Sequence, residues 1–243
     1  MSTVEIGGSL VQDGLVMYID AANSRSYTPL GSNWNDLTKN SERGTIFNSP
    51  AVTFTNTNTY LTFNGTDEYV DFGTDLPING LSQATFCTWV YFTANASPLI
   101  FNRYNTPSID ANADYIGIAA GGSLPTPRCL FGTLTNYTAW STTSTIALNQ
   151  WNYLVFSVTN PSSSVAFYIN NQQVSVSSAI NGAGAGSTIK ATTSIPWTIA
   201  YAFGGGGAFY SNFSISNLYL YNRAITAGEV LQNYTVGRRR FGV

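Results

Sequence analysis

Short runs in which apolar residues dominate or alternate with polar ones recur along the whole chain. In residues 85–92, Trp89 lies on one side of an extended strand, while Phe86 and Val90 lie on the other. Apolar groups on both sides indicate a strand covered on both faces. By the same pattern we expect strands at 15–19, 61–63, 69–72, 85–92, 113–119, 130–134, 151–158, 165–169, 174–176, 197–202 and 213–221.

Between these runs lie clusters of Gly and Asn, which tolerate the positive φ of tight reversals and so favour antiparallel pairing. One helix is predicted at 226–234, where Thr226 and Glu229 have the spacing of a capping box. Residues 178–194 are rich in small residues and are expected to form a long surface loop.

These patterns predict an all-β protein, a two-layer antiparallel β-sandwich with one short C-terminal helix. We expect one sandwich domain at 13–235, preceded by an N-terminal arm at 1–12 and followed by a basic C-terminal tail at 236–243. The arm carries Val4, Ile6 and Leu10 among polar residues and could add a strand to a partner's sheet.

Composition narrows the class of partner. Charged residues make up only 9% of the chain, against roughly 25% in an average soluble protein, and the formal net charge is −2. A neutral polar surface suits hydroxylated ligands or protein contacts, so we expect no nucleic acid partner. No apolar run reaches the roughly 20 residues of a membrane span, and the start lacks a signal-peptide pattern, so a soluble product of the cytoplasm is expected.

Four ordered motifs resemble the laminin-G-like, concanavalin A-like jelly-roll family, in the form found in tailed-phage virion proteins. They read DGLVMYIDAANSRSY followed by WNDL, FNGTDEYVDFG, WNYLVFSVTN with VAFYINNQQV, and ISNLYLYNRAITAGEVLQNY. The ending RRRFGV is similar to the tails of such modules. The resemblance implies the jelly-roll fold and a place in the virion, but a fold alone identifies no ligand.

Catalysis is the first chemistry to test. The chain has no histidine, which removes the commonest general base and metal ligand. Glycosidases of related jelly rolls use paired carboxylates, and Asp67, Glu68 and Asp71 form the available cluster. Because Asp67 lies in a Gly-Thr-Asp turn, we expect turn capping instead, and therefore a protein that is not an enzyme.

Other ligand sites are less defined. The resemblance implies that calcium is possible, with Asp110 and Asp114 as the best acids, but no complete calcium motif is present and no cofactor is expected. Aromatic side chains in polar, turn-rich surroundings could stack on sugar rings, and Tyr104, Tyr137 and Trp140 are the candidates.

The C-terminal residues are candidates for docking on an acidic neighbour: Arg238, Arg239, Arg240 and the apolar anchor Phe241. The leading hypothesis is a non-catalytic phage virion structural protein, a capsid decoration, head-fibre or tail-associated module whose partners are capsid or tail subunits. The alternative is a lectin-like module that binds host glycans, and a glycoside hydrolase comes third. Homo-oligomerisation is compatible with all three.

Overall fold

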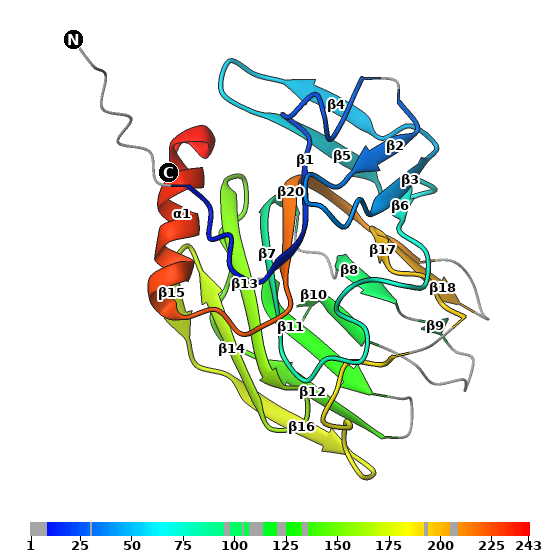
Figure 1. Ribbon diagram of the computed structural model, residues 1–243, viewed down its shortest axis with the longest axis vertical. Coiled ribbons are helices and arrows are strands. Elements are labelled where there is room, and N and C mark those ends of the chain that lie inside the picture. Colours follow the sequence, from blue (N-terminus) through cyan, green and yellow to red (C-terminus); the bar gives the residue numbers. More distant parts are fainter. Residues whose placement is uncertain are drawn as a thin grey trace.

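The structure is a computed structural model that describes residues 9–29, 31–94, 98–103, 105–106, 114–120, 125–132, 136–191, 194–204 and 209–243. Of residues 105–106, 114–120, 181 and 203–204 only the backbone is described. Two antiparallel sheets pack face to face with one helix outside them, which confirms the predicted all-β sandwich (Figure 1).

One layer, here called the back sheet, has eight strands among the described residues. Its central strands are paired without interruption between β13 and β7 and with one irregularity between β7 and β20. In spatial order the layer runs β15 (Gln172–Val174), β14 (Ser164–Ile169), β13 (Trp151–Asn160), β7 (Ala84–Tyr91), β20 (Asn212–Tyr221), β5 (Thr59–Asn64) and β4 (Ala51–Phe54), with β1 (Leu15–Asp20) also paired to β20.

The second layer, the front sheet, has nine described strands. Its order is β16 (Ser177–Asn181), β12 (Tyr137–Ser141), β11 (Pro125–Gly132), β10 (Asp114–Ala120), β8 (Leu99–Arg103), β17 (Thr198–Ile199), β6 (Tyr69–Asp71), β3 (Arg43–Phe47) and β2 (Asn33–Asn35). A small third sheet, formed by β19 (Phe209–Tyr210), β18 (Tyr201–Gly204) and β9 (Asn105–Thr106), adjoins its β17 end.

The main core fills the space between the two layers, where aromatic rings interlock. Phe101 of the front sheet stacks on Trp197 with ring centroids 4.8 Å apart, and Phe86 of the back sheet meets both. Cys87 and Cys129 are buried and form no disulfide. Burial of large side chains between two sheets therefore explains the period-two pattern of the sequence.

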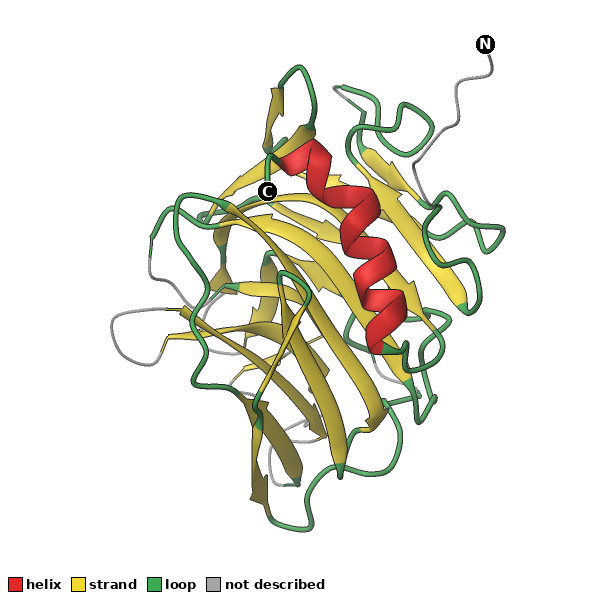
Figure 2. Ribbon diagram, turned by 90° about the vertical axis from the view of Figure 1, so that its left-hand side faces the viewer, coloured by secondary structure: helices red, strands yellow, loops and turns green. Residues whose placement is uncertain are grey.

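Helix α1 (Ala227–Phe241) covers the outer face of the back sheet (Figure 2). The predicted capping box is present, because the Thr226 side chain accepts from the Glu229 N–H and the Glu229 carboxylate accepts from the Thr226 N–H. The Arg223 guanidinium, which bonds this carboxylate, lowers the pKa of Glu229 to about 2. The helix starts where the sequence predicts.

The end of the helix differs from the prediction, which stopped it at residue 234 and left 236–243 as a tail. The helix instead continues to Phe241 and closes on Gly242 in the left-handed conformation. Phe241 stacks on Trp89 of β7 with centroids 4.1 Å apart, and Tyr234 stacks on the same indole at 5.7 Å. Burial of these rings holds the last turns on the sheet, a contact that helix periodicity alone does not reveal.

Two other segments also depart from expectation. Residues 9–12 of the predicted arm lie against α1, where the Val11 N–H donates to Asn233 Oδ1 at 2.9 Å and the Val11 carbonyl accepts from Tyr221. Residues 1–8 of the arm lie outside the described residues. The predicted loop at 178–194 begins with strand β16, which pairs with β12.

Candidate functional site

The two outer faces of the sandwich differ in what covers them. On the back sheet, α1 buries Trp89, Tyr153 and Tyr219. No described helix lies on the outer face of the front sheet (Figure 2). The exposed outer side chains of the front sheet are therefore the first place to look for a site.

Four aromatic rings meet on this open face, here called the aromatic platform: Phe47 of β3, Tyr69 of β6, Tyr201 of β18 and Tyr210 of β19. Ring centroids are 4.4 Å apart for Phe47 and Tyr69, which are parallel, and 4.6 Å apart for Tyr69 and Tyr201. Tyr201 and Tyr210 are 5.0 Å apart. Phe47 is 37% exposed and the three tyrosines are half-buried.

Strand register places the first two rings together. Phe47 pairs with Tyr69, and the neighbouring pair Ile46 and Val70 points into the core. Alternation along a strand then forces Phe47 and Tyr69 outward on the same face. Core packing does not explain why a phenylalanine and a tyrosine are left partly exposed at these two positions.

A backbone irregularity brings the other two rings to the same place. Ala200 separates β17 from β18 and has φ of 66°, a conformation that non-glycine residues rarely adopt. The Ser211 N–H donates to the Ala200 carbonyl, and Asn102 Nδ2 donates to the Tyr201 carbonyl at 3.0 Å. These bonds hold the turn that swings Tyr201 out of the front sheet and toward Tyr69.

A carboxylate and hydroxyl groups border the platform. Asp71 lies two residues after Tyr69 on the same face and pairs with Thr45 and Thr198 on the neighbouring strands. Burial first, and the nearby Asp71 carboxylate second, raise the pKa of the Tyr69 hydroxyl, so this phenol stays protonated and can donate. The face therefore offers stacking surface, a phenolic donor and a carboxylate acceptor side by side.

Two of the aromatic residues predicted from sequence, Tyr137 and Trp140, lie elsewhere. Trp140 is buried in β12, 8% exposed, and its indole N–H donates to the Pro161 carbonyl at 2.9 Å, so it serves the core. Tyr137, in the same strand, is half-buried and packs against Leu130 and Ala139. Tyr104 lies outside the described residues.

The acids singled out for catalysis bond within their own turn. Asp67 Oδ1 accepts from the Asn64 side chain at 2.8 Å, and Glu68 Oε2 accepts from the Asn64 N–H at 2.7 Å. Asp71 Oδ1 accepts from the Gly73 N–H at 2.7 Å. Each carboxylate thus has a local structural partner.

The calcium prediction rests on residues that the structure describes only in part. Asp110 lies outside the described residues, and Asp114 begins β10 with only its backbone described. Elsewhere in the described chain no three residues among His, Cys, Asp and Glu come together as metal ligands. A calcium site remains an expectation of the resemblance alone.

Two of the four docking candidates are exposed on the helix, and the other two make contacts within the domain. Arg238 and Arg239 are exposed on the last turns of α1. Arg240 instead forms an ion pair with Asp20 at 2.6 Å, and Phe241 is buried on Trp89. Arg240 and Phe241 are thus engaged within the domain, and docking on a partner through these four residues stays a prediction.

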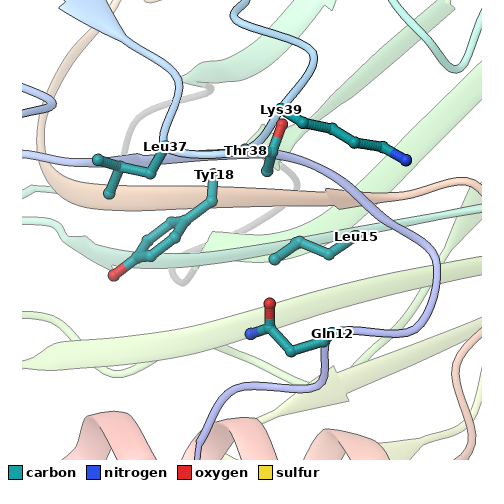
Figure 3. A pocket seen from close by; sticks show the side chains of 6 residues that line it. All are labelled: Gln12, Leu15, Tyr18, Leu37, Thr38 and Lys39. Atoms are coloured by element: carbon teal, nitrogen blue, oxygen red, sulfur yellow. The ribbon is translucent and has the colours of Figure 1, made fainter.

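A separate hollow of about 380 Å³ lies on the α1 side of the molecule (Figure 3). Tyr18 and Leu15 of β1 face Thr38 and Lys39 across it, and Gln12 and Leu37 complete the lining. The Tyr18 hydroxyl donates to Asp20 Oδ2 at 2.7 Å. This bond turns the phenol away from a ligand, so the hollow offers less chemistry than the platform.

No motif in the sequence marks the platform. Phe47 lies in a five-residue strand whose inward positions are Gly44 and Ile46, a pattern too weak to identify. Tyr210 follows a glycine run and reads as part of a turn. The available signal was Tyr69, which faces outward opposite the inward Val70 in a predicted strand.

Two packed antiparallel sheets with a single outer helix define a jelly-roll β-sandwich with one open sheet face. Residues 64–231 match the family model Laminin_G_3, described as the concanavalin A-like lectin/glucanases superfamily. The chain belongs to this superfamily. No curated protein matches it.

Solved structures share the fold at low sequence identity. Domain 4 of AbnA, a GH43 extracellular arabinanase from Geobacillus stearothermophilus solved with arabinotriose, is 16% identical with a TM-score of 0.60, covering 91% of this chain and 98% of that one. The binding domain of botulinum neurotoxin DC, solved with SialylT, is 9% identical with a TM-score of 0.60, covering 92% of this chain and 52% of that one.

A sialidase from Trypanosoma rangeli, solved with sialic acid, is 15% identical with a TM-score of 0.61. The match covers 97% of this chain but only 36% of the sialidase, so the chain spans about a third of that enzyme. In the residues that the structure describes, no helix combines the length and apolar character that crossing a membrane requires.

Proposed function

We propose that this protein is a non-catalytic carbohydrate-binding module whose aromatic platform stacks on sugar rings. The observation that supports the proposal is the contact among Phe47, Tyr69, Tyr201 and Tyr210 on the uncovered face of the front sheet. Strands from two distant parts of the sequence, β3 and β6 in one and β18 and β19 in the other, converge to build it. Partly exposed aromatic rings at such a junction suit the C–H faces of sugars.

The polar border points to neutral sugars. Asp71 can accept hydrogen bonds from ring hydroxyls, and Tyr69 can donate one. A carboxylate beside the platform repels an acidic sugar, because like charges in partly desolvated surroundings are costly. We therefore propose neutral glycans as the ligand class, in contrast to the sialic acid named for the T. rangeli sialidase structure.

Replacing Tyr69 with alanine is expected to weaken glycan binding strongly while leaving the domain folded. Tyr69 touches Phe47, Tyr201 and Tyr210, so its loss divides the platform. Loss of one stacked ring weakens binding by about 2 kcal/mol or more, roughly thirtyfold. A glycan array with wild type and Tyr69→Ala, followed by calorimetry on the strongest neutral ligand, measures the effect.

The matched control is Phe54→Ala, which removes an aromatic ring that is 60% exposed on β4 of the other sheet. It should bind as wild type does. Asp71→Asn should admit acidic glycans that the wild type rejects. Array signal that survives Tyr69→Ala, or falls equally with Phe54→Ala, contradicts the platform as the site.

We propose further that the module is carried on a phage virion, where Arg238 and Arg239 dock on an acidic subunit. The supporting observation is that both guanidinium groups are exposed at the end of a helix fixed to the back sheet, away from the platform. The family resemblance of the sequence motifs points to the same setting.

Charge reversal of this pair, R238E with R239E, should reduce incorporation into particles by at least about tenfold without unfolding the domain. Deletion of 236–243 is a poor test, because it also removes Arg240 and Phe241. Quantification of the protein in purified particles, beside a Lys39→Glu control, measures the effect. Normal incorporation of the double variant would remove the docking role.

A further inference from the structure

One long segment of the chain carries no charge. Residues 129–189 contain no Asp, Glu, Lys, Arg or His. They supply β12 and β16 at one end of the front sheet and β13, β14 and β15 at one end of the back sheet. Soluble proteins average roughly 25% charged residues, and charges keep neighbouring molecules apart. The strands that this segment supplies therefore lack the usual charge barrier to association.

Strand β16 forms the edge of the front sheet at this end. Among the described residues it pairs with β12 alone, in an unbroken register from Ser177 to Asn181. Figure 1 shows it at the rim of the molecule. Ser177, Ser178 and Ala179 are exposed, and Ile180 is 64% exposed. The second edge of β16 thus presents backbone N–H and C=O groups beside an uncovered apolar side chain.

Protein edges are normally protected by lysines, prolines, bulges or very short strands. The sequence Ser-Ser-Ala-Ile-Asn contains no charge and no proline, and the register with β12 has no bulge. The edge strands β2 and β15 are three residues long, and β4 begins directly after Pro50. The six-residue edge strand β1 is bonded on its free side by Asp36 and the Leu37 N–H. Of β2, β4, β15 and β16, β16 is the longest and carries none of these protections.

We propose that β16 pairs antiparallel with β16 of a second copy of this chain, joining two front sheets into one continuous sheet. A strand that pairs antiparallel with itself is self-complementary across a two-fold axis, which is what a closed dimer requires. With Ala179 opposite its own copy, Ser178 faces Ile180 of the partner. No like charges meet, and the apolar side chain of Ile180 is covered.

Such a dimer has a consequence for binding. A two-fold axis perpendicular to the joined sheet keeps both outer faces on the same side. The platform lies near the β3 and β6 end of the front sheet, and β16 lies at the opposite end. Two platforms would then stand at the far ends of one surface and engage a polymeric ligand at two points. The dimer itself does not depend on the proposed glycan.

The decisive experiment places charges at the centre of the proposed interface. Ala179→Lys and Ala179→Glu each put like charges opposite one another and should raise the dimer dissociation constant roughly tenfold or more. An equimolar mixture of the two variants places opposite charges there and should recover the dimer mass. Sedimentation velocity on the full chain, without glycan and over a wide concentration range, measures the dimer fraction of the wild type, of each variant alone and of their mixture.

Ala51→Lys is the matched control, since it places the same charge on the exposed start of the edge strand β4. This variant should dimerise as the wild type does, and circular dichroism should show the same β spectrum for every variant. A wild type that stays monomeric at every concentration overturns the proposal. Dissociation by Ala51→Lys but not Ala179→Lys overturns it too, because the interface would then be β4.

Discussion

Replacing Arg240 with methionine is expected to lower the free energy of unfolding by about 3–5 kcal/mol, the range for breaking a buried ion pair. Arg240 bonds both Asp20 oxygens at 2.6 Å, and its Nε donates to Asn58 Oδ1 at 2.8 Å. Methionine preserves the apolar stem but leaves Asp20, whose side chain is 6% exposed, without its cation. Urea denaturation followed by tryptophan fluorescence measures the loss.

Two further variants identify the cause of that loss. Arg239→Met, on the exposed neighbour in the same helical turn, should change stability by less than about 0.5 kcal/mol. Pairing Arg240→Met with Asp20→Asn should recover part of the loss, because the second change removes the unpaired charge. Equal stability of Arg240→Met and wild type would mean that the ion pair contributes nothing to the fold.

Two glycines of α1 are expected to respond to alanine with opposite signs. A Cβ at Gly237 would lie 2.6 Å from Nε1 of Trp89, an indole that is fully buried and cannot move aside. Overpacking of this kind costs about 1–3 kcal/mol and outweighs the gain of up to about 1 kcal/mol from replacing a helical glycine. Gly237→Ala should therefore destabilise the protein.

Gly228 is the internal comparison, because a Cβ there would meet only the Thr226 hydroxyl, at 3.9 Å. Gly228→Ala should stabilise the protein by about 0.5–1 kcal/mol through helix propensity alone. Thermal unfolding of the two variants beside the wild type distinguishes them. A rise in melting temperature for Gly237→Ala would show that α1 does not pack on Trp89 as described.

The sequence predicted the fold well because sandwich burial leaves a direct mark on residue order. The strand at Trp151–Asn160 and the capping box at Thr226 are visible as alternation and spacing. Weakly patterned strands were missed, as at Arg43–Phe47, where a glycine fills an inward position. The end of α1 was missed because its stability comes from stacking on Trp89, a residue far away in sequence.

The candidate site could not be predicted in the same way. Its rings come from four separate strands. Tyr201 and Tyr210 reach the site through the positive φ of Ala200, and an alanine in the sequence does not indicate that conformation. The polar neighbours of Tyr137 and Trp140 predict a loop, yet those neighbours form strand β12. Local polarity therefore does not distinguish an edge-region strand from a binding loop.

The first described residues are attached to α1, and this attachment decides which surface of a tethered domain would face outward. Gln232 of the helix donates to the Ser9 carbonyl at 2.7 Å, so the chain enters the domain on the side where the helix also ends. Figure 1 shows the first described residues and the C-terminus on that side. If either end were tethered to a larger particle, the opposite broad surface would point into the surrounding medium. The surface used for attachment and the surface proposed to bind a ligand would then lie on different sides of the domain.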